Sequence, residues 1–428
     1  MKTDFSQTDG LRIAVLGGGV AGLTAALLLQ ERHRVTLYER NDYIGGHTNT
    51  IAIPDGPDAG TPVDTGFIVL NNKTYPLFNR LLRRLDCPVR DSDMSFGYHD
   101  EESGLQYAGT GFGGLFAQPL NALKPSYWRF LKEITRFCTT ARADLAAGRL
   151  AGLTVGEYLA QCGFSPFTRR AYILPMAGAI WSSSMRDIEA FPAEMMIRFW
   201  ENHGLLSLED RPQWMTVAGG SQSYVRRAIA RMEGSLHVRA PVRSVRREGG
   251  AVRVEAEGHP TAAFDAVVLA AHADESLRML ADPSADEQRL LGAWNYQRNF
   301  TVLHTDESLM PPNRRAWASW NYRRTAGAGM DGPVPVTYHM NRLQGLHTQR
   351  QYFVTLNSPR APRPETVIRE IDYTHPLFSF ASMRTQAELP ALNGVNRTFF
   401  CGSYFGYGFH EDAVRSGVEV AKQFGIAL

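Results

Sequence analysis

The sequence predicts an α/β fold in which a Rossmann-type FAD-binding domain carries an inserted α+β substrate domain. A short aliphatic run at 12–16 leads into a glycine cluster and then a helical stretch at 23–32. The last forty residues repeat this order, with an apolar run, a glycine-rich loop and a helix. At 428 residues, the chain also exceeds the usual size of one hydrophobic core, so two domains are expected.

The composition argues against several classes of protein. The 45 basic and 43 acidic side chains give a formal net charge of +2, which provides no global field for nucleic acid. The four cysteines form no CxxC pair, so we expect no metal site and a reducing cytosol. The absence of a basic leader and of a long apolar segment predicts a cytoplasmic protein. No feature indicates an oligomeric state.

The chain begins with a predicted βαβ unit. Its strands are the β-branched and aliphatic runs at 12–16 and 34–38, and its helix spans 23–32. Two further segments, 62–70 and 213–217, are also expected to be extended.

The middle and the end of the chain contain further strand signals. The runs 236–245 and 251–256 flank a Glu248-Gly249-Gly250 turn, which predicts a hairpin. Residues 264–271 are almost wholly apolar, as in a buried parallel strand. At the C-terminus we expect a strand at 398–401 and a helix at 411–424.

The spacing of these elements predicts a discontinuous domain arrangement. Between the nucleotide-fold segments lie two stretches rich in aromatic residues, methionine and arginine. We therefore expect an FAD-binding domain made of 1–75, 212–289 and 386–428, and a substrate domain made of 76–211 and 290–385.

The glycine cluster carries the first chemical signal. Gly17-Gly18-Gly19-Val20-Ala21-Gly22 matches GxGxxG between a strand and a helix, where glycines let a pyrophosphate approach the helix N-terminus. Glu39 ends the second strand, where a carboxylate can accept hydrogen bonds from ribose hydroxyls. The expected dinucleotide contacts are Gly17, Gly19, Val20, Ala21, Gly22, Glu39 and Arg40.

Two further motifs separate flavin binding from plain NAD binding. Gly45-Gly46-His47-Thr48 and Val63-Asp64-Thr65-Gly66-Phe67, together with the N-terminal turn, resemble the flavin-containing amine oxidase superfamily. The resemblance implies FAD, in a two-domain architecture similar to that of p-hydroxybenzoate hydroxylase. We expect the FAD to be non-covalent, because no histidine or cysteine lies in an obvious flavin-tethering motif. His47 stands where the superfamily usually has arginine. The implied contacts are Gly45, Gly46, His47, Thr48, Gly66 and Phe67.

The C-terminal motifs extend the resemblance. Phe400-Cys401-Gly402-Ser403 resembles the turn that meets the pyrophosphate, and residues 408–417 resemble the closing helix, whose N-terminus stabilises negative charge on the flavin. Asp412 stands where glycine is common. The implied contacts are Gly402, Glu411, Asp412 and Ala413, and Val242 in the run 236–245 completes the expected cofactor set.

A closer resemblance covers residues 304–341. His304-Thr305-Asp306, Leu309-Met310-Pro311 and Val336-Thr337-Tyr338 are similar to a bacterial branch of predicted NAD/FAD-binding proteins, and that branch resembles the flavin-dependent desaturases of methylated and furan fatty acid synthesis. This implies hydride abstraction from a lipid acyl chain, leading to desaturation or double-bond rearrangement. A true amine oxidase and a non-catalytic flavoprotein are the alternatives.

Three residues near the closing helix are the catalytic candidates. Phe409 occupies the place of a cage tyrosine in amine oxidases, which suits an apolar substrate, although a core role is the alternative. His410 could exchange a proton or serve as a structural hydrogen-bonding group. Tyr407 could contact cofactor or substrate, or act as a lid. Further aromatic residues could line a tunnel or form ordinary core: Trp181, Trp317, Trp320 and Tyr338.

A basic and aromatic stretch at 121–137 gives the only signal for a larger partner. Lys124, Arg129, Lys132 and Arg136 alternate with aromatic side chains, as in segments that rest on anionic membranes. A solvated helix packed on the substrate domain is the alternative. The expected partners are thus an apolar small-molecule substrate and, as a hypothesis, the inner face of a membrane.

Overall fold

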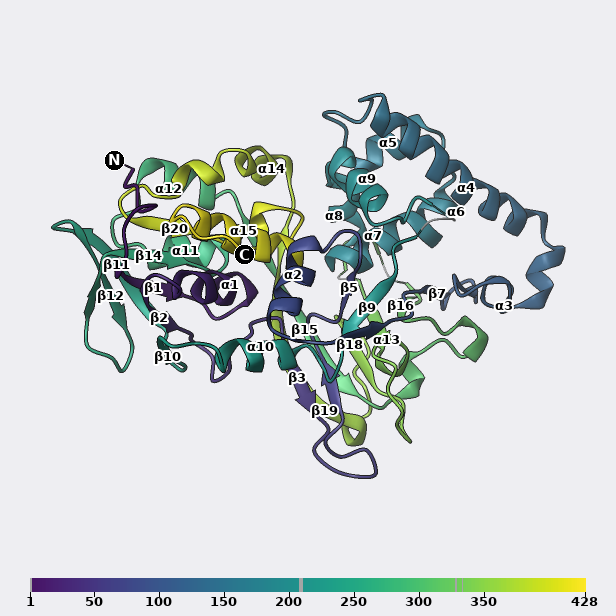
Figure 1. Ribbon diagram of the computed structural model, residues 1–428. Coiled ribbons are helices and arrows are strands. Elements are labelled where there is room, and N and C mark those ends of the chain that lie inside the picture. Colours follow the sequence, from purple (N-terminus) through teal and green to yellow (C-terminus); the bar gives the residue numbers. More distant parts are fainter. Residues whose placement is uncertain (1, 208–210, 328, 333) are drawn as a thin grey trace.

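The computed structural model describes residues 2–207, 211–327, 329–332 and 334–428. The chain forms two halves side by side (Figure 1). One half holds both termini and the parallel sheet, and the other holds a larger sheet under a layer of helices.

A five-stranded parallel sheet forms the core of the first half, in the order β10-β2-β1-β14-β20. Its strands are β1 (Arg12–Leu16), β2 (Arg34–Tyr38), β10 (Ser235–His237), β14 (Ala266–Leu269) and β20 (Thr398–Phe400). The helix α1 (Val20–Leu29) is buried along its whole length and packs against α15 (His410–Lys422). This arrangement confirms the predicted α/β class and explains why α1 is apolar on every face.

Two predicted strands and one segment that was expected to be extended are each divided between two sheets. The first part of the run at 236–245 is β10, which joins the parallel sheet, and the second part is β11 (Val242–Glu248), which forms the predicted hairpin with β12 (Ala251–Ala256). The run at 264–271 divides between β13 (Ala262–Phe264) and β14.

The segment at 62–70 divides between β4 (Pro62–Asp64), paired with β3 (Thr50–Ala52), and β5 (Val69–Asn71), paired with β9 (Trp214–Val217). The predictions of one continuous strand at 236–245 and at 264–271 were wrong, because an extended run keeps its local pattern when it passes from one sheet to another. Pairing with distant strands decides where each piece ends.

A seven-stranded sheet forms the core of the second half, in the order β19-β15-β18-β17-β16-β7-β8. All pairs are antiparallel except β16 with β7. Its strands are β19 (Val367–Leu377), β15 (Asn295–His304), β18 (Phe353–Leu356), β17 (Val336–His339), β16 (Trp320–Arg324), β7 (Phe96–Asp100) and β8 (Gln106–Ala108). All seven lie within the two segments expected to form the substrate domain, and all five parallel strands lie within the other three.

Helices cover the second sheet and join the halves. Those of the covering layer are α3 (Phe112–Leu115), α4 (Pro125–Ala146), α5 (Val155–Gln161), α6 (Pro166–Thr168), α7 (Leu174–Trp181), α8 (Met185–Ala190) and α9 (Ala193–Asn202). The remaining helices and one short strand are α2 (Pro76–Arg84), α10 (Gln222–Ile229), α11 (Ala273–Met279), α12 (Ala285–Leu291), α13 (Met340–Leu343), α14 (Phe380–Gln386) and β6 (Val89–Asp91).

Asp64 connects the two halves. Its buried carboxylate accepts hydrogen bonds from the Ser221 amide and hydroxyl, from the Thr50 hydroxyl and, at 3.1 Å, from the Gln344 side chain. Burial raises the pKa of Asp64 to about 6, despite these hydrogen bonds. The motif around Asp64 therefore has a structural function that the sequence analysis did not assign.

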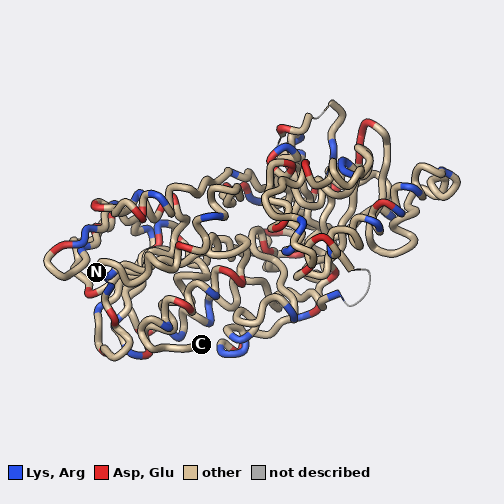
Figure 2. The backbone as a smooth tube through the Cα atoms, turned by 90° about the horizontal axis from the view of Figure 1, so that it is seen from above, with Lys and Arg blue, Asp and Glu red and all other residues tan. Residues whose placement is uncertain are grey.

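Charged residues of both signs are interspersed along the backbone (Figure 2). Among the helices of the described residues, none combines the length and the apolar character that crossing a bilayer would require.

Candidate active site

A cavity of about 1180 Å³ lies where the two halves meet. Gly17 and Glu39, which directly follow β1 and β2 of the parallel sheet, line one end of the cavity. Trp320 and His375 of the seven-stranded sheet line other parts of it. The carboxyl ends of parallel strands, at the point where strand order reverses, are the usual ligand site of such sheets. Here β1 lies between β2 and β14, so the cavity occupies that position.

The glycine turn shapes what we call the nucleotide end of the cavity, lined by Gly17, Gly19, Glu39 and Arg40. Gly19 is the N-cap residue of α1 and provides no side-chain cap. A Cβ added at Gly19 would meet no protein atom within 4 Å, whereas one added at Gly22 would collide with the Gly17 carbonyl. Gly22 thus allows the tight turn, and Gly19 leaves space before a helix N-terminus suited to an anion.

Glu39 holds the next loop in place. One carboxylate oxygen accepts the Gly18 amide and the other accepts the Asn41 amide, both at 2.8 Å. The side chain is buried but borders the cavity, where its remaining lone pairs face the space for a ribose. These features fit a dinucleotide.

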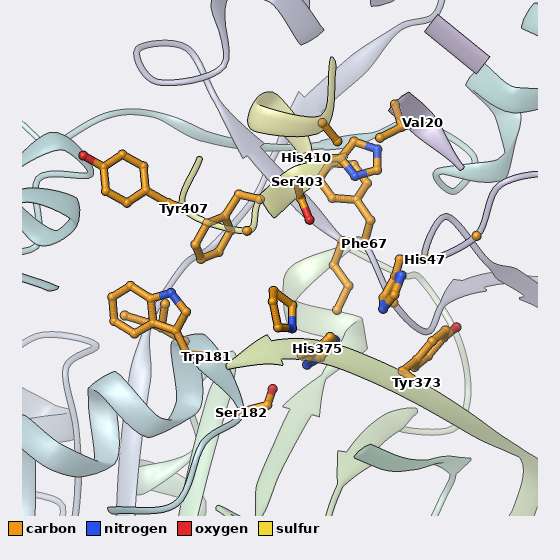
Figure 3. A pocket seen from close by; sticks show the side chains of 18 of the residues that line it. Val20, His47, Phe67, Trp181, Ser182, Tyr373, His375, Ser403, Tyr407 and His410 are labelled. Carbon is orange, nitrogen blue, oxygen red and sulfur yellow. The ribbon is translucent and has the colours of Figure 1, made fainter. Parts of the chain in front are cut away.

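Three histidines cluster further along the cavity. The His47 ring lies 5.0 Å from the Tyr373 ring and 5.3 Å from that of His375, with His272 at 6.2 Å. Figure 3 shows His47 beside Tyr373 and apart from Trp181 and Tyr407. Burial lowers the pKa of His375 to about 4. Burial, together with the neighbouring histidines, also holds the pKa of His47 well below its usual value. Both rings are therefore neutral near pH 7.

His47 offers an unused hydrogen-bonding atom. Its ring hydrogen-bonds to the backbone of Thr374, and its Nε2 has no partner within the described residues. A neutral imidazole that donates through one nitrogen can accept through the other. The residue that replaces the superfamily's arginine can therefore receive a hydrogen bond from a bound cofactor, but it supplies no positive charge.

His410 is fixed by its neighbours. Its ring stacks on Phe67 with centroids 3.7 Å apart, and its Nε2 lies 2.8 Å from the Tyr224 hydroxyl, which contacts the Thr48 hydroxyl at 2.7 Å. Enclosure lowers the pKa of His410 to about 3. The structure therefore favours a neutral positioning ring over a base that titrates near neutral pH. The Thr48 hydroxyl also lies 3.4 Å from the same ring nitrogen.

The acidic residues that open α15 differ from the expectation of direct cofactor contact. The Glu411 carboxylate accepts the amides of Leu77 and Phe78 at 3.0 and 2.9 Å, and so caps α2. Asp412 accepts the amides of Tyr407 and Phe409 at 2.9 and 3.1 Å. Neither residue lines the cavity, because both carboxylates satisfy nearby backbone donors.

The remaining wall is what we call the aromatic half of the cavity. Phe409 stacks on Phe199 at 4.5 Å and meets the Trp181 ring edge-on at 6.4 Å, and Tyr407 lies 5.8 Å from Phe199. Figure 3 shows Tyr407 and Trp181 on the same side of the cavity. The wall is completed by Met94, Phe96, Tyr107, Leu131, Ile134, Tyr172, Met176, Ile180, Trp320 and Tyr338.

The aromatic half also has polar neighbours in the cavity lining, among them Arg211 and His203, whose ring stacks on Phe199 at 3.8 Å. The indole nitrogens of Trp181 and Trp320 have no hydrogen-bond partner in the part of the chain described. Three carboxylates line the whole cavity: Glu39 and Glu275 at the nucleotide end, and Asp372, which forms two hydrogen bonds to Arg298 at 2.8 and 2.5 Å. The aromatic half thus has no free carboxylate among its described lining residues.

The structure brings most of the predicted site residues together. All line the cavity except Gly22, Thr48, Glu411 and Asp412. Trp181, Trp320 and Tyr338 also line it, whereas Trp317 is buried elsewhere and donates to the Pro311 carbonyl. Four cavity residues carry no local motif, were not predicted and reach the cavity through tertiary packing: Phe199, His272, Tyr373 and His375. Tyr224 was not predicted either; it is buried behind the cavity wall and contacts His410.

Comparison with known proteins agrees with this geometry. The family model for flavin containing amine oxidoreductases matches residues 20–333. Carotenoid phi-ring synthase of Streptomyces griseus is 27% identical over 298 residues, which are 64% of this chain and 54% of that protein. The chain spans between 20% and 56% of the length of the curated relatives it matches.

Two solved structures share the fold. Putrescine oxidase with bound putrescine aligns with a TM-score of 0.70 at 17% identity, covering 96% of this chain and 98% of that one. A fatty acid isomerase from P. acnes that produces CLA aligns with a TM-score of 0.64 at 17% identity, covering 97% and 98%.

Proposed function

Because this chain belongs to the flavin containing amine oxidoreductase family, and is therefore a flavin-dependent oxidoreductase, we propose that it binds FAD non-covalently and takes a hydride from a lipid acyl chain. The observation that carries the proposal is the aromatic half of the cavity, which offers apolar surface and, among its described lining residues, no free carboxylate.

The nucleotide end supports FAD as the form of flavin. The open space before Gly19 suits a pyrophosphate, and the Glu39 carboxylate suits an adenosine ribose. The unpartnered Nε2 of His47 suits a hydroxyl or N–H donor of the cofactor. When bound, the flavin supplies a hydride acceptor for a substrate carbon.

The aromatic half supports an acyl chain over a polyamine. Each methylene moved from water into such surroundings contributes about 0.8 kcal/mol, which favours long chains. A cationic amine would find no free carboxylate there, and Phe409 has no hydroxyl to offer it. The solved fatty acid isomerase is a relative whose substrate class is consistent with this choice.

The neutral imidazoles fit the second half of such a reaction. Desaturation would transfer a hydride to a bound flavin and a proton from the adjacent carbon to a base, whereas double-bond rearrangement would return the hydride at another carbon. A proton beside an electron-deficient carbon is acidic, so a weak base such as His375, with a pKa of about 4, is strong enough to receive it. The packed rings of Phe199 and Phe409 exclude water from this step.

The test is anaerobic flavin reduction by chosen substrates. Purified holoenzyme is mixed with dispersed unsaturated or methyl-branched acyl lipids and, separately, with putrescine and an aromatic amine. We expect bleaching near 450 nm with an acyl lipid, and a product with a new or shifted double bond by mass spectrometry. Rapid bleaching by an amine alone would replace the proposal with an amine oxidase, and no bleaching by any substrate would favour a non-catalytic flavoprotein.

A further inference from the structure

Four large apolar side chains project from one end of the molecule. Phe112, Leu120 and Leu123 are each more than 70% exposed, and Trp128 is half exposed. They belong to α3, to the 3-10 turn Pro119–Leu123 and to the start of α4. Single exposed apolar residues are common, but such a cluster marks an interaction surface. We call these four residues the apolar tip.

The apolar tip is held in place by its own hydrogen bonds and ring contacts. The Trp128 indole N–H donates to the Ala122 carbonyl at 2.8 Å, and Phe116 lies between Phe112 and Trp128 at ring distances of 4.7 and 5.4 Å. The exposure of these side chains is therefore a consequence of the local fold.

Basic side chains are close to the apolar tip in the sequence. Residues 103–142 hold five basic residues and a single acidic one, Glu133. Glu133 accepts hydrogen bonds from the hydroxyls of Ser165 and Thr168. Lys124, Arg129 and Lys132 are exposed, and no ion pair involves them among the described residues. Arg136 differs, because it stacks on Phe164 and donates to the carbonyls at 162 and 163.

The cavity reaches the same end of the molecule. Gly111 and Leu115 flank Phe112 in the sequence, while Leu131, Ile134 and Thr135 follow Trp128 along α4, and all five line the cavity. Gly111 and Thr135 are exposed, so the aromatic half approaches the surface beside the apolar tip. Figure 1 places α3 and the start of α4 at the end of the molecule opposite the parallel sheet.

We propose that the apolar tip inserts into the headgroup region of an anionic bilayer, with Lys124, Arg129 and Lys132 against the lipid phosphates. The combination of exposed Trp, Phe and Leu with unpaired cations is complementary to such a surface. If the substrate is an acyl chain, as proposed above, this orientation lets the chain pass from the bilayer into the aromatic half of the cavity beside α3 without crossing water.

Vesicle binding by the holoenzyme tests the docking separately from catalysis. We expect flotation with phosphatidylglycerol-containing vesicles, weaker binding at 0.5 M salt and little binding to phosphatidylcholine alone. Removing one cation lowers vesicle partition by about fivefold, so Lys132→Glu, which reverses a charge, should lower it by more than tenfold. Lys73→Glu is the matched control, because Lys73 is exposed and lies outside 103–142.

The apolar contribution is tested by the double variant Leu120→Ser, Leu123→Ser. We expect at least a tenfold loss of vesicle partition with unchanged flavin content, whereas Phe300→Ser, at an exposed phenylalanine outside the apolar tip, should bind as the unmodified protein does. Vesicles should also shift the tryptophan emission to the blue, and this shift should be smaller in Trp128→Phe.

The outcomes separate the two proposals. Vesicle binding without flavin reduction by any lipid would uphold the docking and overturn the acyl substrate. Absence of vesicle binding, or binding unaffected by the tip variants, would overturn the docking, while reduction by detergent-dispersed lipid would still uphold the substrate. Self-association that disappears in the Leu120→Ser, Leu123→Ser variant would also overturn the docking, because the tip would then be covered by a second copy.

Discussion

Gly19→Val should remove the cofactor and leave the fold intact. Gly19 has φ −68° and ψ 175°, an extended conformation that valine adopts readily. A Cβ there meets no protein atom within 4 Å, so the new side chain lies in the cavity, in front of the first amides of α1. We expect a cost to folding of at most about 1 kcal/mol, from the weaker N-cap.

The cost to FAD binding is much larger. Hydrogen bonds from amides to a charged phosphate contribute about 1.5–3 kcal/mol each, so losing two of them lowers affinity by about 10²- to 10⁴-fold. The assay is the ratio of absorbance at 450 nm to that at 280 nm, with FAD released by denaturation and quantified by chromatography. Urea unfolding of the apo-protein reports the fold.

Two matched variants complete the experiment. Gly113→Val also places its Cβ in open space, but away from the cavity, and should retain FAD. Gly22→Val should lose both FAD and stability, because its Cβ collides with the Gly17 carbonyl. Stoichiometric FAD in a folded Gly19→Val protein would show that the turn is not the phosphate site.

Three further predictions follow from single contacts. Glu39→Gln should weaken FAD binding by about 10- to 100-fold, because the substitution removes the charge that accepts hydrogen bonds from two loop amides and from the ribose. Titration of the apo-protein with FAD measures the affinity, and an unchanged affinity would exclude the ribose role. Phe409→Tyr should leave FAD binding unchanged and slow anaerobic reduction by acyl lipid about 10-fold, through an unpartnered hydroxyl; equal or faster reduction would contradict an apolar site. The third prediction concerns His304, whose pKa burial lowers from 6.5 to about 4, so that the unfolded chain takes up the proton first as the pH falls. Between pH 7.5 and 4.5, the free energy of unfolding, measured with urea, should therefore fall by about 2–3 kcal/mol more in the unmodified protein than in His304→Gln. Equal pH dependence of the two proteins would refute this.

The nucleotide end could be predicted because its signals are local. A strand, three glycines and a helix within twenty residues specify the turn, and Glu39 follows at the end of the next strand. The roles of Glu411 and Asp412 could not be predicted, because they depend on which amide donors approach from α2 and from the loop at 407–409. The division of the run 236–245 between two sheets likewise depends on pairing with β2, which is about two hundred residues away in the sequence.

The aromatic half could not be assembled from the sequence for a related reason. Phe199, Trp320 and His375 come from a helix and two strands that meet only in the folded chain, and each one alone is an ordinary core residue. Family membership therefore specifies the flavin chemistry, whereas the substrate has to be inferred from the wall of the cavity. The most discriminating feature of that wall is the absence of a free carboxylate among the described lining residues.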